Sequence, residues 1–147
     1  MRRSAPIALL AATAVAALSL AAPAMAGGRS YETTLLGANE VGTVGDADGS
    51  GSATITVNRG QGQICYSITV TGVAPISAGH IHEAGVTASG PVVVSLLPEG
   101  SMLSEGTATG CVDVSRTLAK EISKDPSDYY VNVHNAEFPA GALRGQL

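Results

Sequence analysis

Hydrophobic and polar residues alternate at every second position through much of the chain beyond residue 30. The two clearest runs of hydrophobic positions consist of Ala53, Ile55 and Val57, and of Ile64, Tyr66, Ile68 and Val70. A glycine-rich break at residues 59–62 separates them and suits a hairpin loop. Because successive side chains of a strand point to opposite faces, this pattern predicts strands with one buried face and one polar face.

Further segments have the same strand character. They cover residues 31–37, 78–83, 92–97, 107–114, 129–134 and 142–147. Residues 115–124 differ, because Leu118 and Ile122 lie four positions apart on one helical face, Ser115 can cap a helix and Pro126 would end it. About eight strands and one short helix predict an all-β fold, an antiparallel β-sandwich or barrel.

The first 26 residues have the features of a secretory signal peptide. Arg2 and Arg3 supply the positive start, residues 7–22 are apolar, and residues 24–26 (Ala-Met-Ala) match the small-x-small cleavage pattern. The apolar stretch is too short to favour a membrane span, and no comparable run follows it. We therefore expect cleavage near Ala26 and export of the chain to the cell exterior or the periplasm.

The remaining residues, 27–147, have the size of one domain without a transmembrane segment. The full sequence contains 8 Lys and Arg against 12 Asp and Glu. Two of the arginines belong to the predicted signal peptide, so the exported chain is clearly acidic. Since an acidic surface repels phosphate backbones, nucleic acid is not expected as a partner.

Cys65 and Cys111 are the two cysteines of the chain. In an oxidising compartment, two cysteines favour a disulfide over two free thiols. Each cysteine alternates with the apolar positions of its predicted strand and therefore points to the opposite side. We expect the disulfide on an outer face or near an edge of the sheet.

All three histidines of the chain lie on the polar sides of predicted strands. His80 and His82 share one side while Ile81 faces the other, and His134 shares a side with Asn132. Two imidazoles at i and i+2, with a third from a neighbouring strand, can hold one ion and leave a coordination position open. Neutral imidazole suits zinc or copper. Unless the two strands adjoin, however, these histidines only form hydrogen bonds to loops or solvent, and the sequence leaves both alternatives open.

Three polar residues are candidates for supporting roles at such a site. Glu83 follows His82 directly, Glu137 comes three residues after His134, and Asn132 lies on the predicted polar side. Either glutamate could accept a hydrogen bond from a ligand or serve as a general base. Exposed glutamates beside loops are, however, usually just solvated.

Four segments of the chain together resemble the CHRD domain, a family named after chordin and widespread in microbial secreted proteins. These segments are TLLGANEV at 34–41, GHIH at 79–82, GPVVVSLL at 90–97 and YVNVHNAEFPAGALRGQL at 130–147. The resemblance implies an immunoglobulin-like β-sandwich or barrel, in agreement with the strand count. It supplies no established activity for single-domain members, and growth-factor binding is not expected because the cysteine-rich modules of chordin are absent from this sequence.

The chain departs from the family pattern near its end. Family members commonly carry an acidic residue shortly before the final Arg-Gly-Gln-Leu, where this chain has Ala142 and its neighbours. Arg144 therefore lacks that candidate partner. We predict that Glu40 pairs with Arg144 instead, which requires the first and last strands to meet.

The sequence His80-Ile81-His82-Glu83 with a distant His134 is also similar to the copper-ligand pattern of copper-zinc superoxide dismutases. The chain has no further histidines for their zinc site or for a fourth copper ligand. We therefore favour a secreted, non-enzymatic binding or structural module that holds copper or zinc through the three histidines and engages an extracellular protein or polysaccharide. The alternative is a copper- or zinc-dependent enzyme that uses the same three histidines.

Overall fold

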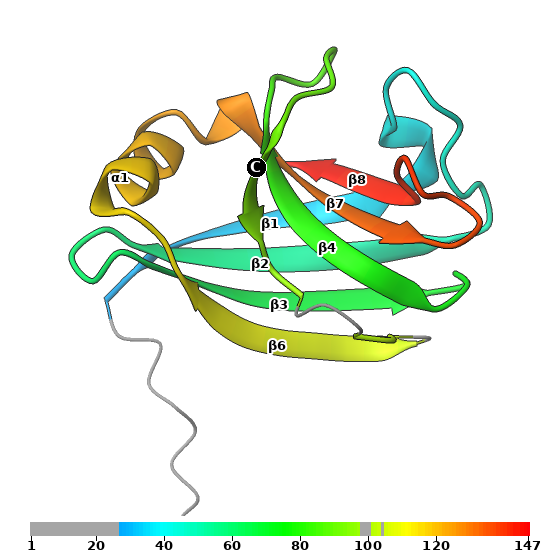
Figure 1. Cartoon of the computed structure of the whole chain (residues 1–147), viewed down its shortest axis with the longest axis horizontal. Helices are drawn as coiled ribbons and strands as arrows, with labels where there is room; N and C mark the ends of the chain where they lie inside the picture. Colours follow the sequence, from blue (N-terminus) through cyan, green and yellow to red (C-terminus); the bar gives the residue numbers. More distant parts are fainter. Residues whose placement is uncertain (1–26, 98–100, 104) are drawn as a thin grey trace, which may run out of the picture.

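The computed structural model describes residues 27–97, 101–103 and 105–147. The predicted signal peptide lies outside these residues. Within them, eight antiparallel strands form one sheet that is rolled into a nearly closed barrel (Figure 1). The strands are β1 (Arg29–Leu36), β2 (Ser50–Asn58), β3 (Gln63–Thr71), β4 (Ile76–Glu83), β5 (Val92–Ser95), β6 (Gly106–Asp113), β7 (Tyr129–Asn135) and β8 (Leu143–Gln146). The helical elements are η1 (Gly37–Asn39), α1 (Arg116–Lys124) and η2 (Pro126–Asp128).

The order of strands in the sheet is β5-β4-β7-β8-β1-β2-β3-β6. The first and last strands meet, because Leu36 of β1 lies opposite Arg144 of β8. The two edges of the sheet are β5 and β6. An isolated bridge between Ile76 and Leu103 ties the chain just before β6 to the start of β4. The predicted all-β class is thus confirmed, in its barrel form.

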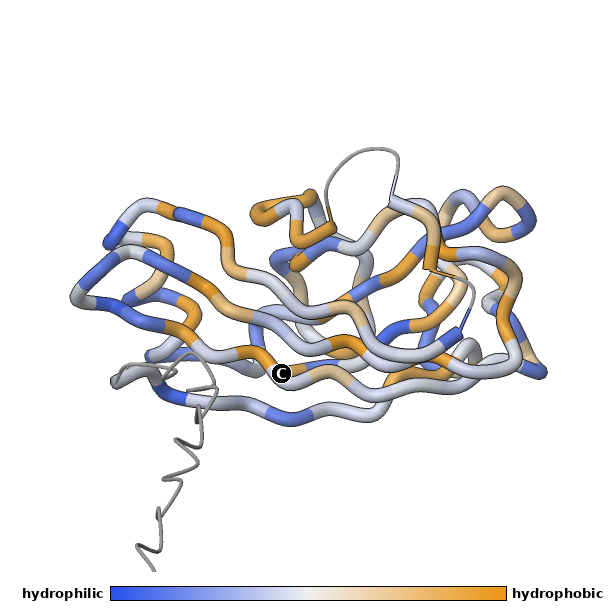
Figure 2. The backbone as a smooth tube through the Cα atoms, turned by 90° about the horizontal axis from the view of Figure 1, so that it is seen from below, coloured by the Kyte–Doolittle hydropathy of each residue, from blue (hydrophilic) through white to orange (hydrophobic). Residues whose placement is uncertain are grey.

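The period-two hydrophobic positions fill the interior of the barrel. Every member of the two runs predicted from the sequence is buried, and Figure 2 shows how the hydropathy alternates along the strands. Helix α1 lies against the barrel and adds Ala119 and Ile122 to the core (Figure 1). The side chain of Ser115 caps this helix by accepting a hydrogen bond from the backbone N–H of Leu118, at 3.0 Å.

Part of the outer face of β4, β7 and β8 is also buried. Two loops cover it, residues 40–49 between η1 and β2 and residues 84–91 between β4 and β5. Asn132 and Arg144 are only 2% and 1% exposed there, although both point away from the core. The sequence predicted this side to be polar but not that it would be covered. The result is a second buried layer, polar in composition, outside the barrel.

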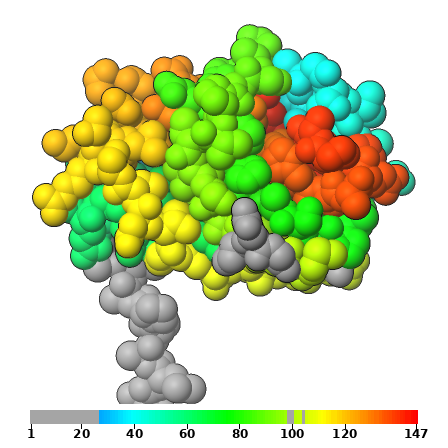
Figure 3. Space-filling view, viewed as in Figure 1, coloured from blue at the N-terminus to red at the C-terminus, as the bar shows by residue number. Residues whose placement is uncertain are grey.

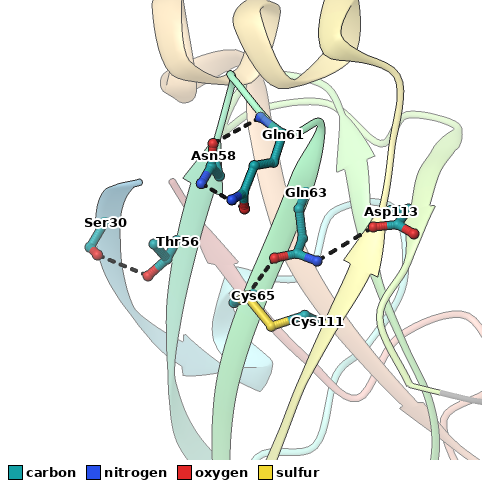
Figure 4. The surroundings of a disulfide bond; sticks show 8 residues. All are labelled: Ser30, Thr56, Asn58, Gln61, Gln63, Cys65, Cys111 and Asp113. Atoms are coloured by element: carbon teal, nitrogen blue, oxygen red, sulfur yellow. Dashed lines mark hydrogen bonds between the residues drawn. A yellow bond between two sulfur atoms is a disulfide. The ribbon is translucent and has the colours of Figure 1, made fainter. Parts of the chain in front are cut away.

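Cys65 of β3 and Cys111 of the edge strand β6 lie directly opposite each other and are joined in a disulfide. Figure 4 shows the disulfide on the outside of the sheet, among polar side chains that include Gln63 and Asp113. Cys65 is half-buried and Cys111 is exposed. This placement agrees with the outer-face, near-edge position expected from the alternation of side chains.

Candidate metal centre

The histidines come from the neighbouring strands β4 and β7. In the antiparallel register of these strands, His80 lies opposite Asn132 and Ala78 lies opposite His134. The two strands therefore bring all three imidazoles to one place on the outer face. Each ring offers one nitrogen atom as a ligand, and these three nitrogen atoms lie within 4.8 Å of one another. The strand adjacency that the sequence left open is thus present.

Backbone carbonyls fix the orientation of two of the rings. The Nδ1 atom of His82 lies 2.9 Å from the carbonyl oxygen of Gly90, and the Nδ1 atom of His134 lies 3.2 Å from that of Pro139. A carbonyl oxygen can only accept, so both Nδ1 atoms carry hydrogen in these bonds. The lone pair of each ring therefore lies on Nε2, which is how proteins commonly prepare a histidine to bind a metal.

One further nitrogen of each ring is buried without a partner. Nε2 of His82, Nε2 of His134 and Nδ1 of His80 are inaccessible to solvent and make no hydrogen bond to any described residue. Buried polar atoms are nearly always satisfied in proteins, and an orphaned one costs about 1–3 kcal/mol. Three such atoms in one small cluster indicate that something other than the described residues completes the site.

The electrostatic environment keeps these rings neutral. Burial lowers the pKa of His134 to about 4, and the neighbouring His80 and His82 rings act in the same direction. Burial also lowers the pKa of His80 and of His82, assisted by the adjacent ring for His80 and by the charge of Arg144 for His82. Metal ions bind the neutral imidazole, so little proton release is needed at neutral pH.

The cluster is slightly wider than one bound ion requires. Zinc-to-nitrogen bonds are about 2.0–2.1 Å long, so nitrogens in a tetrahedral or trigonal site lie roughly 3.3–3.6 Å apart. The nitrogens here lie within 4.8 Å of one another, so the rings have to close by at most about 1.5 Å to hold one ion. Three protein ligands leave at least one coordination position open.

Acidification is expected to destabilise the metal-free protein through these histidines. Their folded-state pKa values lie below the ordinary 6.5, so the unfolded chain binds more protons between pH 6.5 and about 4. Stability is therefore retained above pH 6.5 and lost as the pH falls toward 4. The measurement is the urea midpoint from pH 7.5 to 4.5, beside a His80→Ala/His82→Ala/His134→Ala variant. If the urea midpoint changed with pH equally in the two proteins, the result would contradict the lowered pKa values of the histidines.

The ring of His82 stacks on the ring of Tyr130, which in turn contacts the guanidinium group of Arg144. Tyr130 lies opposite His82 in the strand register, and their rings are parallel, with an interplanar angle of 8° and centroids 4.8 Å apart. The guanidinium carbon of Arg144 lies 3.5 Å from the centroid of the Tyr130 ring. No sequence pattern predicted this stack, because it depends on which strands flank β7.

The loop at residues 84–91, here called the cover loop, is held over this stack by side chains of β7 and β8. Arg144 donates hydrogen bonds of 2.9 Å to the carbonyl oxygens of Gly85 and Ala88, and Gln146 donates one to Ala84. The Tyr130 hydroxyl accepts from the N–H of Gly90, at 3.3 Å. In Figure 3 the cover loop lies beside the segments around residues 40 and 140 on one face of the molecule. The Gly90 carbonyl that orients His82 therefore depends on this whole arrangement.

Glu40 and Arg144 lie in the same region without a direct ion pair. The Glu40 carboxylate accepts a hydrogen bond from Nδ2 of Asn132, while Arg144 is engaged by the cover loop. Among the described residues, the direct ion pair is the exposed Lys124–Asp125. Burial raises the pKa of Glu40 to about 7, and the Asn132 hydrogen bond and the Arg144 charge partly oppose that rise. Glu40 and Arg144 thus interact through space, and Asn132 is the direct partner of Glu40.

The other two predicted supporting residues lie apart from the imidazole cluster. Glu83 follows His82 on β4, so its side chain points to the opposite face, where its charge acts on Tyr129. Glu137 is exposed, and its backbone N–H donates to the side chain of Asn135. Within the described residues, the cluster of candidate metal ligands consists of histidines alone.

The fold and the site define a class of protein: a small antiparallel barrel with a three-histidine cluster on its outer face. The CHRD domain family model matches residues 31–147. The chain therefore belongs to the CHRD domain family, as the four sequence segments indicated. No curated protein and no solved structure matches the chain.

Proposed function

We propose that the protein is an extracellular CHRD module that binds one copper or zinc ion through His80, His82 and His134. Two observations carry this proposal: the three imidazoles form one cluster, and each ring has a buried nitrogen without a hydrogen-bond partner among the described residues. The hydrogen bonds that the rings make to loops do not account for these nitrogens. Those bonds use Nδ1 of His82 and of His134, and Nδ1 of His80 is buried without a partner.

Two observations support a location outside the cytoplasm. The sequence begins with the features of a signal peptide. The domain carries a disulfide, which is typical of oxidising compartments. In the part of the chain that the structure describes, no helix has the length and hydrophobicity needed to cross a membrane.

Catalysis at the same ion is the second candidate function. One observation favours it, since three protein ligands leave a coordination position that a substrate could occupy. A hydrolytic enzyme also needs a general base near the ion. Neither Glu83 nor Glu137 belongs to the histidine cluster. A module that binds metal without turnover is therefore the better-supported function.

The proposal is tested by titrating the purified protein, residues 27–147, with copper and with zinc in a calorimeter. We expect one ion to bind per chain, and we expect binding to be lost in the His80→Ala/His82→Ala/His134→Ala variant. Binding of equal strength in this variant, or no binding above millimolar affinity in the wild type, would overturn the proposal. Dismutase or hydrolytic turnover by the loaded wild type would favour the enzyme instead.

A further inference from the structure

Arg144 is the largest fully buried side chain among the described residues, and it has no carboxylate in direct contact. Its guanidinium donates to two carbonyl oxygens of the cover loop and, at 3.3 Å, to Oε1 of Gln146. All of these acceptors are neutral. A buried charge without a carboxylate in direct contact is costly. The Tyr130 ring and the more distant Glu40 carboxyl group offset only part of that cost.

The charge of Arg144 lies close to the proposed metal site. Strand β7 lies between β4 and β8 in the sheet, so His82 and Arg144 reach Tyr130 from its two sides. One aromatic ring therefore separates the guanidinium from His82. Buried charges are weakly screened, so an ion at the histidines experiences this positive charge.

The candidate ligands contribute no negative charge. Three imidazoles bind as neutral groups, and the cluster contains no carboxylate or thiolate. Glu40 is the carboxyl group connected to this region, and it is linked through Asn132 and not to a histidine. A divalent ion would therefore place two positive charges beside Arg144 in a largely desolvated position. A monovalent ion would place only one.

We propose that the three-histidine site selects the cuprous ion over cupric and zinc ions, and that Arg144 is a residue that determines this specificity. The inference rests on the proposed function, since it presupposes that the histidines bind an ion. Three neutral nitrogen donors can form a three-coordinate site, which copper(I) accepts without an additional anionic ligand. At this range in a protein, one full charge changes the relative affinity for ions that differ by one charge on the order of tenfold.

The test compares the affinities of the purified protein for copper(I), copper(II) and zinc. Copper(I) is kept reduced with ascorbate under anaerobic conditions, and each affinity is measured by competition with a chromophoric chelator. Arg144→Gln removes the charge, whereas Arg144→Lys keeps the charge but loses the planar donor fork and the stacking on Tyr130. Lys120→Gln, on the exposed surface of α1, is the matched control for a change of net charge.

For the wild type we expect tighter binding of copper(I) than of zinc. Arg144→Gln should lower the ratio of copper(I) to copper(II) affinity about tenfold, which corresponds to a fall of about 59 mV in the potential of the bound copper. Arg144→Lys should retain most of the wild-type ratio, and Lys120→Gln should retain all of it. At pH 8, above the pKa of about 7 for Glu40, Glu40→Gln removes a nearby negative charge but can keep the hydrogen bond from Asn132. It should therefore shift the ratio in the opposite direction.

Other outcomes would overturn the inference. Equal losses of affinity for all three ions in both Arg144 variants would assign Arg144 a purely structural role. Wild-type binding of zinc more tightly than copper(I) would contradict the selectivity while leaving the proposed function intact. No binding of any ion would refute the proposed function itself. If Arg144→Gln does not fold, an unchanged ratio in Glu40→Gln would still count against the electrostatic mechanism.

Discussion

Replacement of His80 by leucine is expected to stabilise the metal-free protein by about 1 kcal/mol and to weaken copper binding at least about 100-fold. Nδ1 of His80 is buried without a hydrogen-bond partner among the described residues. Leucine removes this unsatisfied atom and adds apolar contact. The loss of affinity should be at least as large as that for residues that only support a ligand, which is about 10–100-fold.

The opposite signs of the two effects separate a metal site from a structural role. If the histidines only organised loops, the His80→Leu change would leave stability unchanged or reduce it. His134→Leu is the internal comparison, because it also removes the hydrogen bond to Pro139 and should therefore give a smaller gain in stability. Urea denaturation without metal and calorimetric titration with copper measure the two quantities.

Replacement of Gly90 by alanine is expected to reduce metal affinity about 10–100-fold and stability by about 2 kcal/mol. A Cβ atom at Gly90 would overlap the backbone carbonyl of Glu83. Since a backbone group cannot rotate away as a flexible side chain can, the cover loop has to move. The Gly90 carbonyl would then lose its place beside Nδ1 of His82, and the ring would lose its fixed orientation.

Gly85→Ala is the matched control for this change. Gly85 belongs to the same cover loop, but a Cβ atom there would meet nothing within 4 Å. Its carbonyl oxygen would still accept from Arg144. We expect wild-type affinity and stability for Gly85→Ala. Similar losses in both variants would show that the loop tolerates no change at all and would remove the argument that Gly90 orients His82.

The barrel could be predicted from the sequence because one physical rule governs it. Alternate positions of a strand face opposite sides, so residues such as Ile55 and Ile68 identified the core directly. The same rule placed the histidines on the outer side and the cysteines away from the core. The helix could be predicted from nearby residues as well. Ser115 marks its start, and the spacing of Leu118 and Ile122 defines its buried face without reference to the rest of the chain.

The surroundings of the histidines could not be predicted in the same way. His82, Tyr130 and Arg144 stack only because β7 pairs with both β4 and β8, and the sequence does not contain that order of strands. The carbonyl groups that orient His82 and His134 belong to Gly90 and Pro139, and a backbone group has no residue-type signature. The Glu40–Arg144 pair was predicted because this chain lacks the family's usual acidic residue before Arg144. In the structure, Asn132 donates to Glu40, and carbonyl groups of the cover loop accept from Arg144.

The disulfide between Cys65 and Cys111 also bears on how the protein avoids self-association. It fixes β6, one of the two edge strands, to its neighbour β3. A free edge strand can pair with another chain or exchange with a second copy, which leads to aggregation. Because β6 cannot detach from the sheet without breaking a covalent bond, strand exchange through this edge is blocked. The covalent link therefore protects the domain against aggregation through β6.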